Sequence, residues 1–305
     1  MRTSSSSPRR NSRWSVPNAD TGSNGRSDHS GNCRSTSVRT SDFETSTSSA
    51  CSFVILLHTA AMAVMDGWVP GVHTASGVTH PTYRKGSGPG VVVISEIPGI
   101  TEDVVGFPEE VVGEGLTVVL PHLFGKVPSS DSPLAAMSSL RQACVNREFN
   151  KLRLRQTSPI ADWLRSLARE LHAELGGPGV GALGMCFTGG FALAMMVDDS
   201  VAAPVLAQPS LPFPVGRARG ADLNLSPTDL SKVKERAAAG CEVLGLRYRN
   251  DLAVGTRFET LTHEIGEKFI RVEFPGRKHA TLTAHRQQEA VDRVLAFLRE
   301  KLLGS

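Results

Sequence analysis

From about residue 66 to its end, the chain alternates short apolar runs with longer amphipathic segments. This alternation predicts an α/β fold with a mostly parallel central sheet and helices on both faces. The reason is that a strand–helix–strand unit joins parallel strands by a right-handed crossover connection. In such sheets ligands bind at the carboxyl ends of the strands, so the residues just after each strand are the candidates for chemistry. The predicted strands are 91–95, 116–120, 180–185, 203–207, 242–248 and 269–274, and the predicted helices are 102–113, 159–175, 189–197, 227–239, 256–266 and 286–303.

The first part of the chain has a different composition. Residues 1–50 contain fifteen Ser, and their few large apolar residues are scattered without a period of 2 or 3.6. Such a segment cannot bury enough apolar surface to offset the entropy of ordering. We therefore expect a disordered Ser/Arg-rich extension over residues 1–61 and a single α/β domain over 62–305. An alternative expectation is that the protein starts at Met62 or Met65.

The net charge of the chain belongs to this extension. Residues 1–50 carry seven Arg and four acidic residues, a balance of +3 that equals the net charge of the whole chain, 33 minus 30. Residues 51–305 carry 26 basic and 26 acidic residues and therefore sum to zero. The predicted domain lacks the basic excess typical of nucleic-acid binding, so we expect no nucleic-acid partner.

Signals for export and for cofactors are weak. Arg9 and Arg10 form a twin arginine without an apolar segment directly after it, and the apolar run 53–64 is too short to span a bilayer. The cysteines are odd in number and contain no C-x-x-C pair, which argues against a disulfide framework or a zinc site. We expect a cytoplasmic protein with no membrane association, no metal and no organic cofactor, existing as a monomer or a small homo-oligomer.

Residues 184–190 read G-M-C-F-T-G-G and place Cys186 in a turn between a predicted strand and a predicted helix. This context is typical of a nucleophile elbow, whose pattern is G-x-[Ser or Cys]-x-G. Gly184 and Cys186 fit the pattern, whereas Thr188 occupies the second glycine position. A thiol at the tip of such a turn lies under the positive end of the following helix, which lowers its pKa and supplies N–H donors to an oxyanion. The alternative is a buried, inert cysteine in a glycine-rich turn.

A nucleophile of this kind needs an acid and a base, in the chain order nucleophile, acid, base. Asp251 follows the predicted strand 242–248 and His279 follows the predicted strand 269–274, so both lie at carboxyl strand ends in the required order. His285 is an alternative base. Four aspartates are expected to be solvated helix or loop charges: Asp198, Asp199, Asp222 and Asp229. His122 is expected to pack or to contact substrate rather than to catalyse.

Four segments together resemble the dienelactone hydrolase (carboxymethylenebutenolidase) family of α/β-hydrolases. They are S-E-I-P-G-I from Ser95, G-M-C-F-T-G-G from Gly184, Y-R-N-D from Tyr248 and H-A-T-L-T from His279. The resemblance covers roughly residues 88–300, and cysteine at the elbow is its specific part because most α/β-hydrolases place serine there. It implies an α/β-hydrolase fold and the hydrolysis of a small-molecule ester or lactone.

The resemblance also implies a role for each site residue. Cys186 would be the nucleophile, His279 the general base and acid, and Asp251 the group that orients the imidazole. A glutamate matching Glu96 contacts the thiol in that family and helps to deprotonate it when substrate enters. The backbone N–H groups of Ile97 and Phe187 would form the oxyanion hole.

The chain also departs from the family. Family members bind a substrate carboxylate with arginines, one of them four residues after the catalytic histidine, where this chain has Thr283. Arg147 is the first alternative for that contact, and Arg277 and Arg286 are further ones. Two other functions stay open: a thiol redox sensor in which Cys186 pairs with Cys144 or Cys241, and a catalytically silent α/β-hydrolase that binds a ligand or acts as a scaffold.

Overall fold

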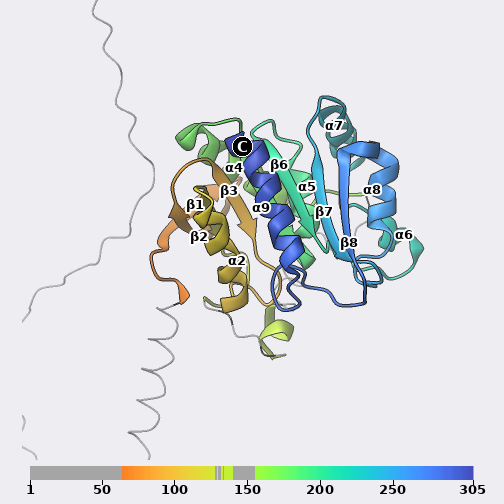
Figure 1. Cartoon of the computed structure of the whole chain (residues 1–305), viewed down its shortest axis with the longest axis horizontal. Helices are drawn as coiled ribbons and strands as arrows, with labels where there is room; N and C mark the ends of the chain where they lie inside the picture. The colour runs from red at the N-terminus through yellow and green to blue at the C-terminus, as the bar shows by residue number, and fades with distance from the viewer. Residues whose placement is uncertain (1–63, 128, 130–131, 133, 140–154, 305) are drawn as a thin grey trace, which may run out of the picture.

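The computed structural model describes residues 64–127, 129, 132, 134–139 and 155–304 (Figure 1). The expectations for residues 1–61, Cys144 and Arg147 lie outside this part of the chain. The strands are β1 (Val69–Ala75), β2 (Val78–Gly86), β3 (Gly90–Ile94), β4 (Thr117–Pro121), β5 (Val180–Met185), β6 (Val201–Ala207), β7 (Val243–Tyr248) and β8 (Phe269–Phe274). The helices are α2 (Glu102–Gly113), α4 (Ile160–Leu175), α5 (Gly189–Met195), α6 (Arg217–Ala221), α7 (Pro227–Ala238), α8 (Arg257–Ile265) and α9 (Gln288–Leu303), with 3-10 turns η2 (Cys186–Thr188) and η3 (Gly266–Lys268).

The eight described strands form one sheet in the order β1-β2-β4-β3-β5-β6-β7-β8. From β4 to β8 every neighbouring pair is parallel, and β2 is antiparallel to both of its neighbours. The predicted mostly parallel sheet is therefore confirmed. The six predicted strands correspond to β3 through β8, and the six predicted helices to α2, α4, α5, α7, α8 and α9, with bounds shifted by at most about two residues.

The hairpin of β1 and β2 and the short helix α6 were not among the predicted elements. The hairpin turns through Ser76 and Gly77, both with positive φ, which suits the two-residue turn of a twisted hairpin. A Ser-Gly pair was thus a usable signal. Pro70 and Pro81 lie within the two strands and break the apolar alternation that marks a strand.

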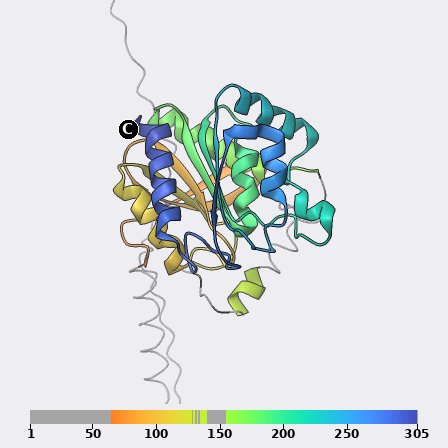
Figure 2. The ribbon, with the colours of Figure 1, turned by 45° about the vertical axis from the view of Figure 1, so that its right-hand side comes forward.

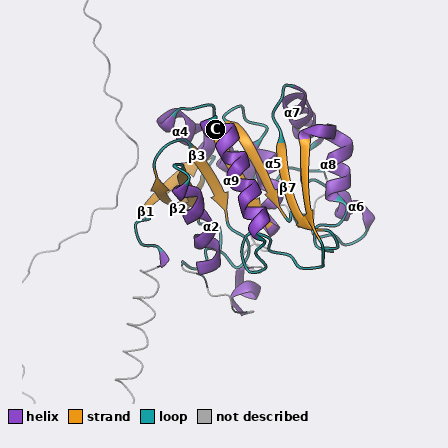
Figure 3. Cartoon of the chain, viewed as in Figure 1, coloured by secondary structure: helices purple, strands orange, loops and turns teal. Residues whose placement is uncertain are grey.

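Helices cover both faces of the sheet, α2 and α9 on one face and α4, α5 and α8 on the other (Figures 2 and 3). Strand β3 shows why its sequence is continuously apolar: Val91 and Val93 pack into one of the two cores, Val92 and Ile94 into the other. A strand buried on both faces has no side for polar residues. Among the described residues, no helix is long and apolar enough to cross a membrane.

The chain reverses direction across the sheet at β3. From β3 it passes through α2 to β4 on one side, and then through α4 to β5 on the other side of β3. The segments that follow β3 and β5 therefore leave toward opposite faces, since α2 and α5 contribute to different cores. In parallel α/β sheets, ligands bind at the carboxyl ends of the two strands beside such a reversal.

Candidate active site

The strand–turn–helix around Cys186 is present as predicted. Strand β5 ends at Met185, η2 makes a single tight turn, and α5 begins at Gly189. Cys186 has φ of +53°, a left-handed conformation that costs energy for a residue with a Cβ and that marks strained functional turns. A Cβ at Gly184 would lie 2.2 Å from the carbonyl oxygen of Thr188, so this turn requires glycine at 184.

Glycine is not required at position 188, where the sequence departs from the elbow pattern. Thr188 has φ of −94°, a conformation open to any residue. The tight contact falls one residue later: a Cβ at Gly189 would lie 2.6 Å from the Cα of Pro209, in the segment after β6. The small residue that helix packing needs is therefore Gly189.

Asp251 and His279 come together from the ends of β7 and β8. The Nδ1 of His279 donates to the Oδ2 of Asp251 over 2.6 Å, so the other ring nitrogen, Nε2, takes no part in this bond. Asp251 is buried, and its Oδ1 accepts a hydrogen bond from the N–H of Ala253 at 3.0 Å. Two hydrogen bonds thus fix the carboxylate that orients the imidazole.

The pKa of His279 also brings Cys186 into this group. Burial by itself lowers the pKa of the imidazole, but the hydrogen bond to Asp251 and the hydrogen-bonding and Coulombic interactions with Cys186 outweigh it and raise the pKa to about 10. A histidine that is held by a carboxylate and interacts with a cysteine is the arrangement of a cysteine nucleophile with its base. His279 therefore interacts with both of the other residues singled out at strand ends, Asp251 and Cys186.

Ser210 is a neighbour of the thiol that the sequence did not single out. Its Oγ lies 3.4 Å from the Sγ of Cys186, and its N–H donates to the carbonyl of Cys186 at 2.9 Å. Ser210 is buried and follows the end of β6 by three residues. A search of the residues after every strand would have included it.

Glu96 follows β3 and is buried at the same edge of the sheet. One carboxylate oxygen accepts from the hydroxyl of Thr283, and the other lies 3.5 Å from the Nε2 of Gln208. Burial raises the pKa of Glu96, and Thr283, His279 and Gln208 each oppose that rise. Among the described residues no hydrogen bond joins Glu96 to Cys186, so the carboxylate faces the segment after His279 instead.

Gln208 completes this polar cluster and was also missed by the sequence analysis. It is fully buried, with φ of +37°, and its backbone N–H donates to Leu246 at 2.7 Å. Its side-chain oxygen accepts from both the N–H and the hydroxyl of Thr281, at 3.2 and 2.7 Å. Gln208 therefore joins Glu96 to the segment that carries His279. No local pattern marks a lone glutamine after a strand.

The two predicted oxyanion donors lie on the turns after β3 and β5. Ile97 lies in a turn closed by a 2.8 Å hydrogen bond from the N–H of Gly99 to the carbonyl of Glu96. Phe187 follows the nucleophile in η2, and its ring packs edge-on against Phe124 with centroids 5.9 Å apart. Both turns start from adjacent parallel strands, which brings them to the same end of the sheet.

Among the alternatives for acid and base, the four aspartates and His122 have side-chain partners of their own, and His285 is exposed. His285 is exposed, and its backbone carbonyl accepts from the hydroxyl of Tyr248 at 2.5 Å. The ring of His122 contacts the carbonyl of Gly125 at 3.1 Å, and burial lowers its pKa. The acids have structural partners: Asp198 with Arg169 and Ser200, Asp199 with Arg236, Asp222 with the N–H groups of Arg155 and Asn224, and Asp229 with Arg165.

The residues considered for a substrate carboxylate are also placed. Thr283 is buried against Glu96. Arg286 makes a two-bond ion pair with Glu110 at 2.7 and 2.8 Å, on the outer surface. Arg277 is exposed in the turn after β8. Thr283 and Arg286 are therefore already paired with Glu96 and Glu110, and Arg277 is exposed to solvent.

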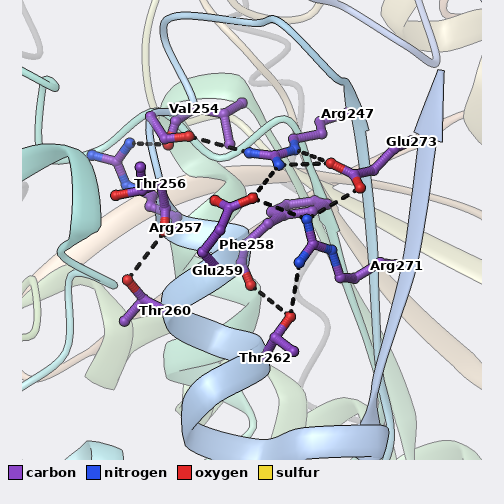
Figure 4. A network of polar contacts seen from close by, with 11 residues as sticks. Arg247, Val254, Thr256, Arg257, Phe258, Glu259, Thr260, Thr262, Arg271 and Glu273 are labelled. Carbon is purple, nitrogen blue, oxygen red and sulfur yellow. Dashed lines mark hydrogen bonds and ion pairs between the residues drawn. The ribbon is translucent and has the colours of Figure 1, made fainter. Parts of the chain in front are cut away.

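Two arginines hold the segment that carries Asp251 (Figure 4). Arg257 is buried and donates to backbone carbonyls of its own segment, Ala253 at 3.2 Å and Val254 at 2.7 Å, and to those of the segment after β6. Burial lowers its pKa to about 10, and Asp222 opposes that shift. Arg247 donates to the carbonyl of Gly255 at 3.1 Å, so both cations fasten the turn after β7.

Cys241 cannot serve as a disulfide partner of Cys186. Its Sγ lies 4.0 Å from the carbonyl of Val201, at the amino end of β6, whereas Cys186 follows Met185, which pairs with Ala207 at the other end. Six residue-to-residue steps along β6 separate the two ends by about 20 Å. Within the described ranges, no group of three or more His, Cys, Asp and Glu side chains could hold a metal ion.

A mostly parallel sheet with helices on both faces, an elbow after β5, and polar side chains after β3, β7 and β8 define the α/β-hydrolase class. The sequence model of the dienelactone hydrolase family matches residues 77–297, and the chain belongs to this family of hydrolases. A comparison with curated proteins gave no match.

Solved structures share the fold. A putative dienelactone hydrolase from Klebsiella pneumoniae is 19% identical, with a TM-score of 0.51, over 77% of this chain and 100% of its own. A dienelactone hydrolase from Anabaena variabilis is 15% identical, with a TM-score of 0.55, over 77% of this chain and 98% of its own. At these identities the likeness supports the architecture and leaves the roles of individual residues to the geometry of this chain.

Proposed function

We propose that this protein hydrolyses ester or lactone bonds through a Cys186–His279–Asp251 triad and a thioester intermediate. The observation that carries the proposal is the 2.6 Å hydrogen bond between His279 and Asp251, in a pair whose imidazole pKa responds to Cys186. The left-handed φ of Cys186 adds to it, because a strained turn at this position projects the side chain out of the sheet.

In the first half-reaction, the thiolate of Cys186 attacks the acyl carbon and the carbonyl electron pair moves to oxygen. The N–H groups of Ile97 and Phe187 stabilise this oxyanion. The intermediate then collapses: the carbon–oxygen bond to the leaving group breaks, and the imidazolium of His279 gives its Nε2 proton to the departing alkoxide or enolate. An ester gives a free alcohol or enol and a thioester on Cys186, whereas a lactone opens to one thioester whose acyl chain carries the hydroxyl or enol.

In the second half-reaction, neutral His279 removes a proton from water as the water oxygen attacks the thioester carbon. The carbon–sulfur bond breaks, and the thiolate and imidazolium form again beside Asp251. The carboxylic acid product gives its remaining proton to bulk water and leaves as a carboxylate. Asp251 keeps the Nδ1–H tautomer throughout, so that Nε2 faces the reaction.

Glu96 has a proposed regulatory role that requires a movement. Contact of its carboxylate with the thiol needs the side chain to turn away from Thr283 and Gln208. In that arrangement the thiol stays protonated without substrate, and the thiolate that begins the reaction forms when substrate displaces Glu96. Cys186 should then react slowly with iodoacetamide at neutral pH in the absence of substrate, and Glu96→Gln should react faster. Rapid stoichiometric labelling of the unmodified protein would count against this role.

The decisive experiment is a turnover assay with dienelactones, simple lactones and p-nitrophenyl esters, run on the full chain beside Cys186→Ala and His279→Ala. We expect each variant to lose at least about a hundredfold in kcat/KM. Arg299→Ala is a suitable control, since Arg299 pairs with Glu114 on the surface. Variants with the activity of the unmodified protein would refute the triad, and turnover of aryl esters alone would exclude the dienelactone as substrate.

Three further properties remain predictions from the sequence. They are a cytoplasmic location, a monomeric or small homo-oligomeric state, and Arg147 as a substrate contact.

A further inference from the structure

The hydroxyl of Thr188 lies between the strand ends that carry the two halves of the proposed site. It accepts a hydrogen bond from the N–H of Met185 at 3.0 Å, directly before the nucleophile. Three carbonyl oxygens lie within reach of its one proton: that of Ile94 at 2.9 Å, that of Met185 at 3.0 Å and that of Ser95 at 3.2 Å. The nearest of them, Ile94, ends β3 just before Glu96 and Ile97. A glycine at position 188 could make none of these contacts.

The position of this hydroxyl follows from the sheet register. Ile94 and Gly184 form the last pair in which β3 and β5 are joined, and beyond it the two chains separate toward opposite faces. The backbone of Thr188 packs directly over Gly184. The Thr188 side chain therefore lies where β3 and β5 begin to separate. Thr188 is fully buried there, so water does not compete for its hydrogen bonds.

We propose that Thr188 is a positioning residue, whose hydroxyl holds the turn of the nucleophile Cys186 in register with the turn that carries the oxyanion donor Ile97. The inference rests on the proposed hydrolytic function for its effect on catalysis. The sulfur and the oxyanion donors must act on the same acyl group. The relative position of the two turns therefore affects the free energy of the transition state. Cys186 and Ile97 lie on the turns that follow β5 and β3, and the hydroxyl of Thr188 contacts the backbone at the ends of both strands, next to their last pair.

The test compares Thr188→Ser, which keeps the hydroxyl, with Thr188→Val, which keeps the shape and removes it. With an aryl ester we expect Thr188→Val to lower kcat by about 10- to 100-fold with little change in KM, because a small misplacement acts on the transition state. Thr188→Ser should stay within about threefold of the unmodified protein. Equal kcat in Thr188→Val and the unmodified protein would overturn the proposal.

Amide hydrogen exchange gives a second readout that does not need turnover. In Thr188→Val the amide of Met185 loses its acceptor, so its exchange and that of residues 95–97 should accelerate, while amides of β8 keep their rates. Thr188→Gly takes the place of Thr188→Val if the valine variant does not fold. An unmodified protein that turns over no ester refutes the proposed function, whereas unchanged exchange at Met185 and residues 95–97 refutes the positioning role by itself.

Discussion

Glu96 and Thr283 lie 187 positions apart in the chain, and the hydroxyl of Thr283 donates a hydrogen bond to the carboxylate of Glu96 in the buried end of the sheet. Thr283, four residues after His279, is thus a neutral hydrogen-bond donor whose hydroxyl is already bonded to a carboxylate of the protein. This pairing ties the turn after β3 to the segment that carries the proposed base.

Removing that donor should destabilise the protein in a pH-dependent way. Thr283→Val leaves the ionised Glu96 with one fewer donor and should lower the free energy of unfolding by about 1–3 kcal/mol. Since burial already raises the pKa of Glu96, the loss should be small at low pH and grow as pH rises through that pKa. Urea denaturation at pH 5 and pH 9 measures it. Thr283→Ser is the control, and an equal loss at both pH values would contradict the pairing with an ionised carboxylate.

The imidazole of His279 should titrate at lower pH once either partner is removed. Interactions with Asp251 and Cys186 raise its pKa to about 10 against the opposing effect of burial. We therefore expect Cys186→Ala, and separately Asp251→Asn, to lower the pKa of His279 by at least about one unit. Histidine-selective NMR titration measures this. A pKa that does not move in Cys186→Ala would mean that the thiol and imidazole do not interact.

The same raised pKa predicts how stability depends on pH. In the folded state His279 binds its proton more tightly than in the unfolded chain, so its contribution is fully present below about pH 6.5. The contribution is lost as pH rises toward about 10. The unmodified protein should therefore exceed His279→Gln in stability most at pH 6, with the difference shrinking by pH 10, as measured by urea denaturation. A difference that widens with pH would reverse the sign and exclude a raised pKa.

Ser210 should assist the thiolate. Its hydroxyl lies 3.4 Å from the Sγ of Cys186 and can donate to the sulfur when the thiol is ionised. We expect Ser210→Ala to lower kcat/KM for an aryl ester about tenfold, the effect of losing about 1.4 kcal/mol of charge-assisted hydrogen bonding. Ser200→Ala is the matched control, because Ser200 precedes the opposite end of β6 and bonds to Asp198. Equal losses in both variants would assign the effect to folding.

Arg257 should stabilise the fold through its backbone contacts (Figure 4). Arg257→Met would leave several buried carbonyls without donors, and we expect it to lower the free energy of unfolding by at least about 2–3 kcal/mol. Arg299→Met removes an arginine from an exposed ion pair and should change stability by less than about 1 kcal/mol. Similar values for the two variants, measured by urea denaturation, would show that the carbonyls around Arg257 find other donors.

Much of the architecture could be read from local patterns. The continuous apolar run of β3 predicts a strand with two buried faces, and Val91 to Ile94 alternate between two cores as that pattern requires. The order Cys186, Asp251, His279 along the chain, each after a strand, predicts their meeting at one edge. The hairpin of β1 and β2 was missed because prolines interrupt its apolar period, although Ser76 and Gly77 mark its turn.

The polar surroundings of the thiol could not be read in this way. Ser210 and Gln208 reach the site because β6 lies directly beside β5, and Thr283 reaches Glu96 because the segment after β8 crosses back toward β3. Thr188 looked like a defect in a glycine pattern, yet its hydroxyl contacts the backbone of both β3 and β5.

Local patterns are enough to locate the strands and helices and the side chains at the strand ends, because apolar periodicity and turn composition act over a few neighbouring residues. Which of those ends are neighbours, and which polar groups share hydrogen bonds, follows from the fold as a whole. The order of strands in a sheet depends on contacts between residues far apart in the chain. In the sheet order β3-β5-β6-β7-β8, five separate turns come together around one cysteine.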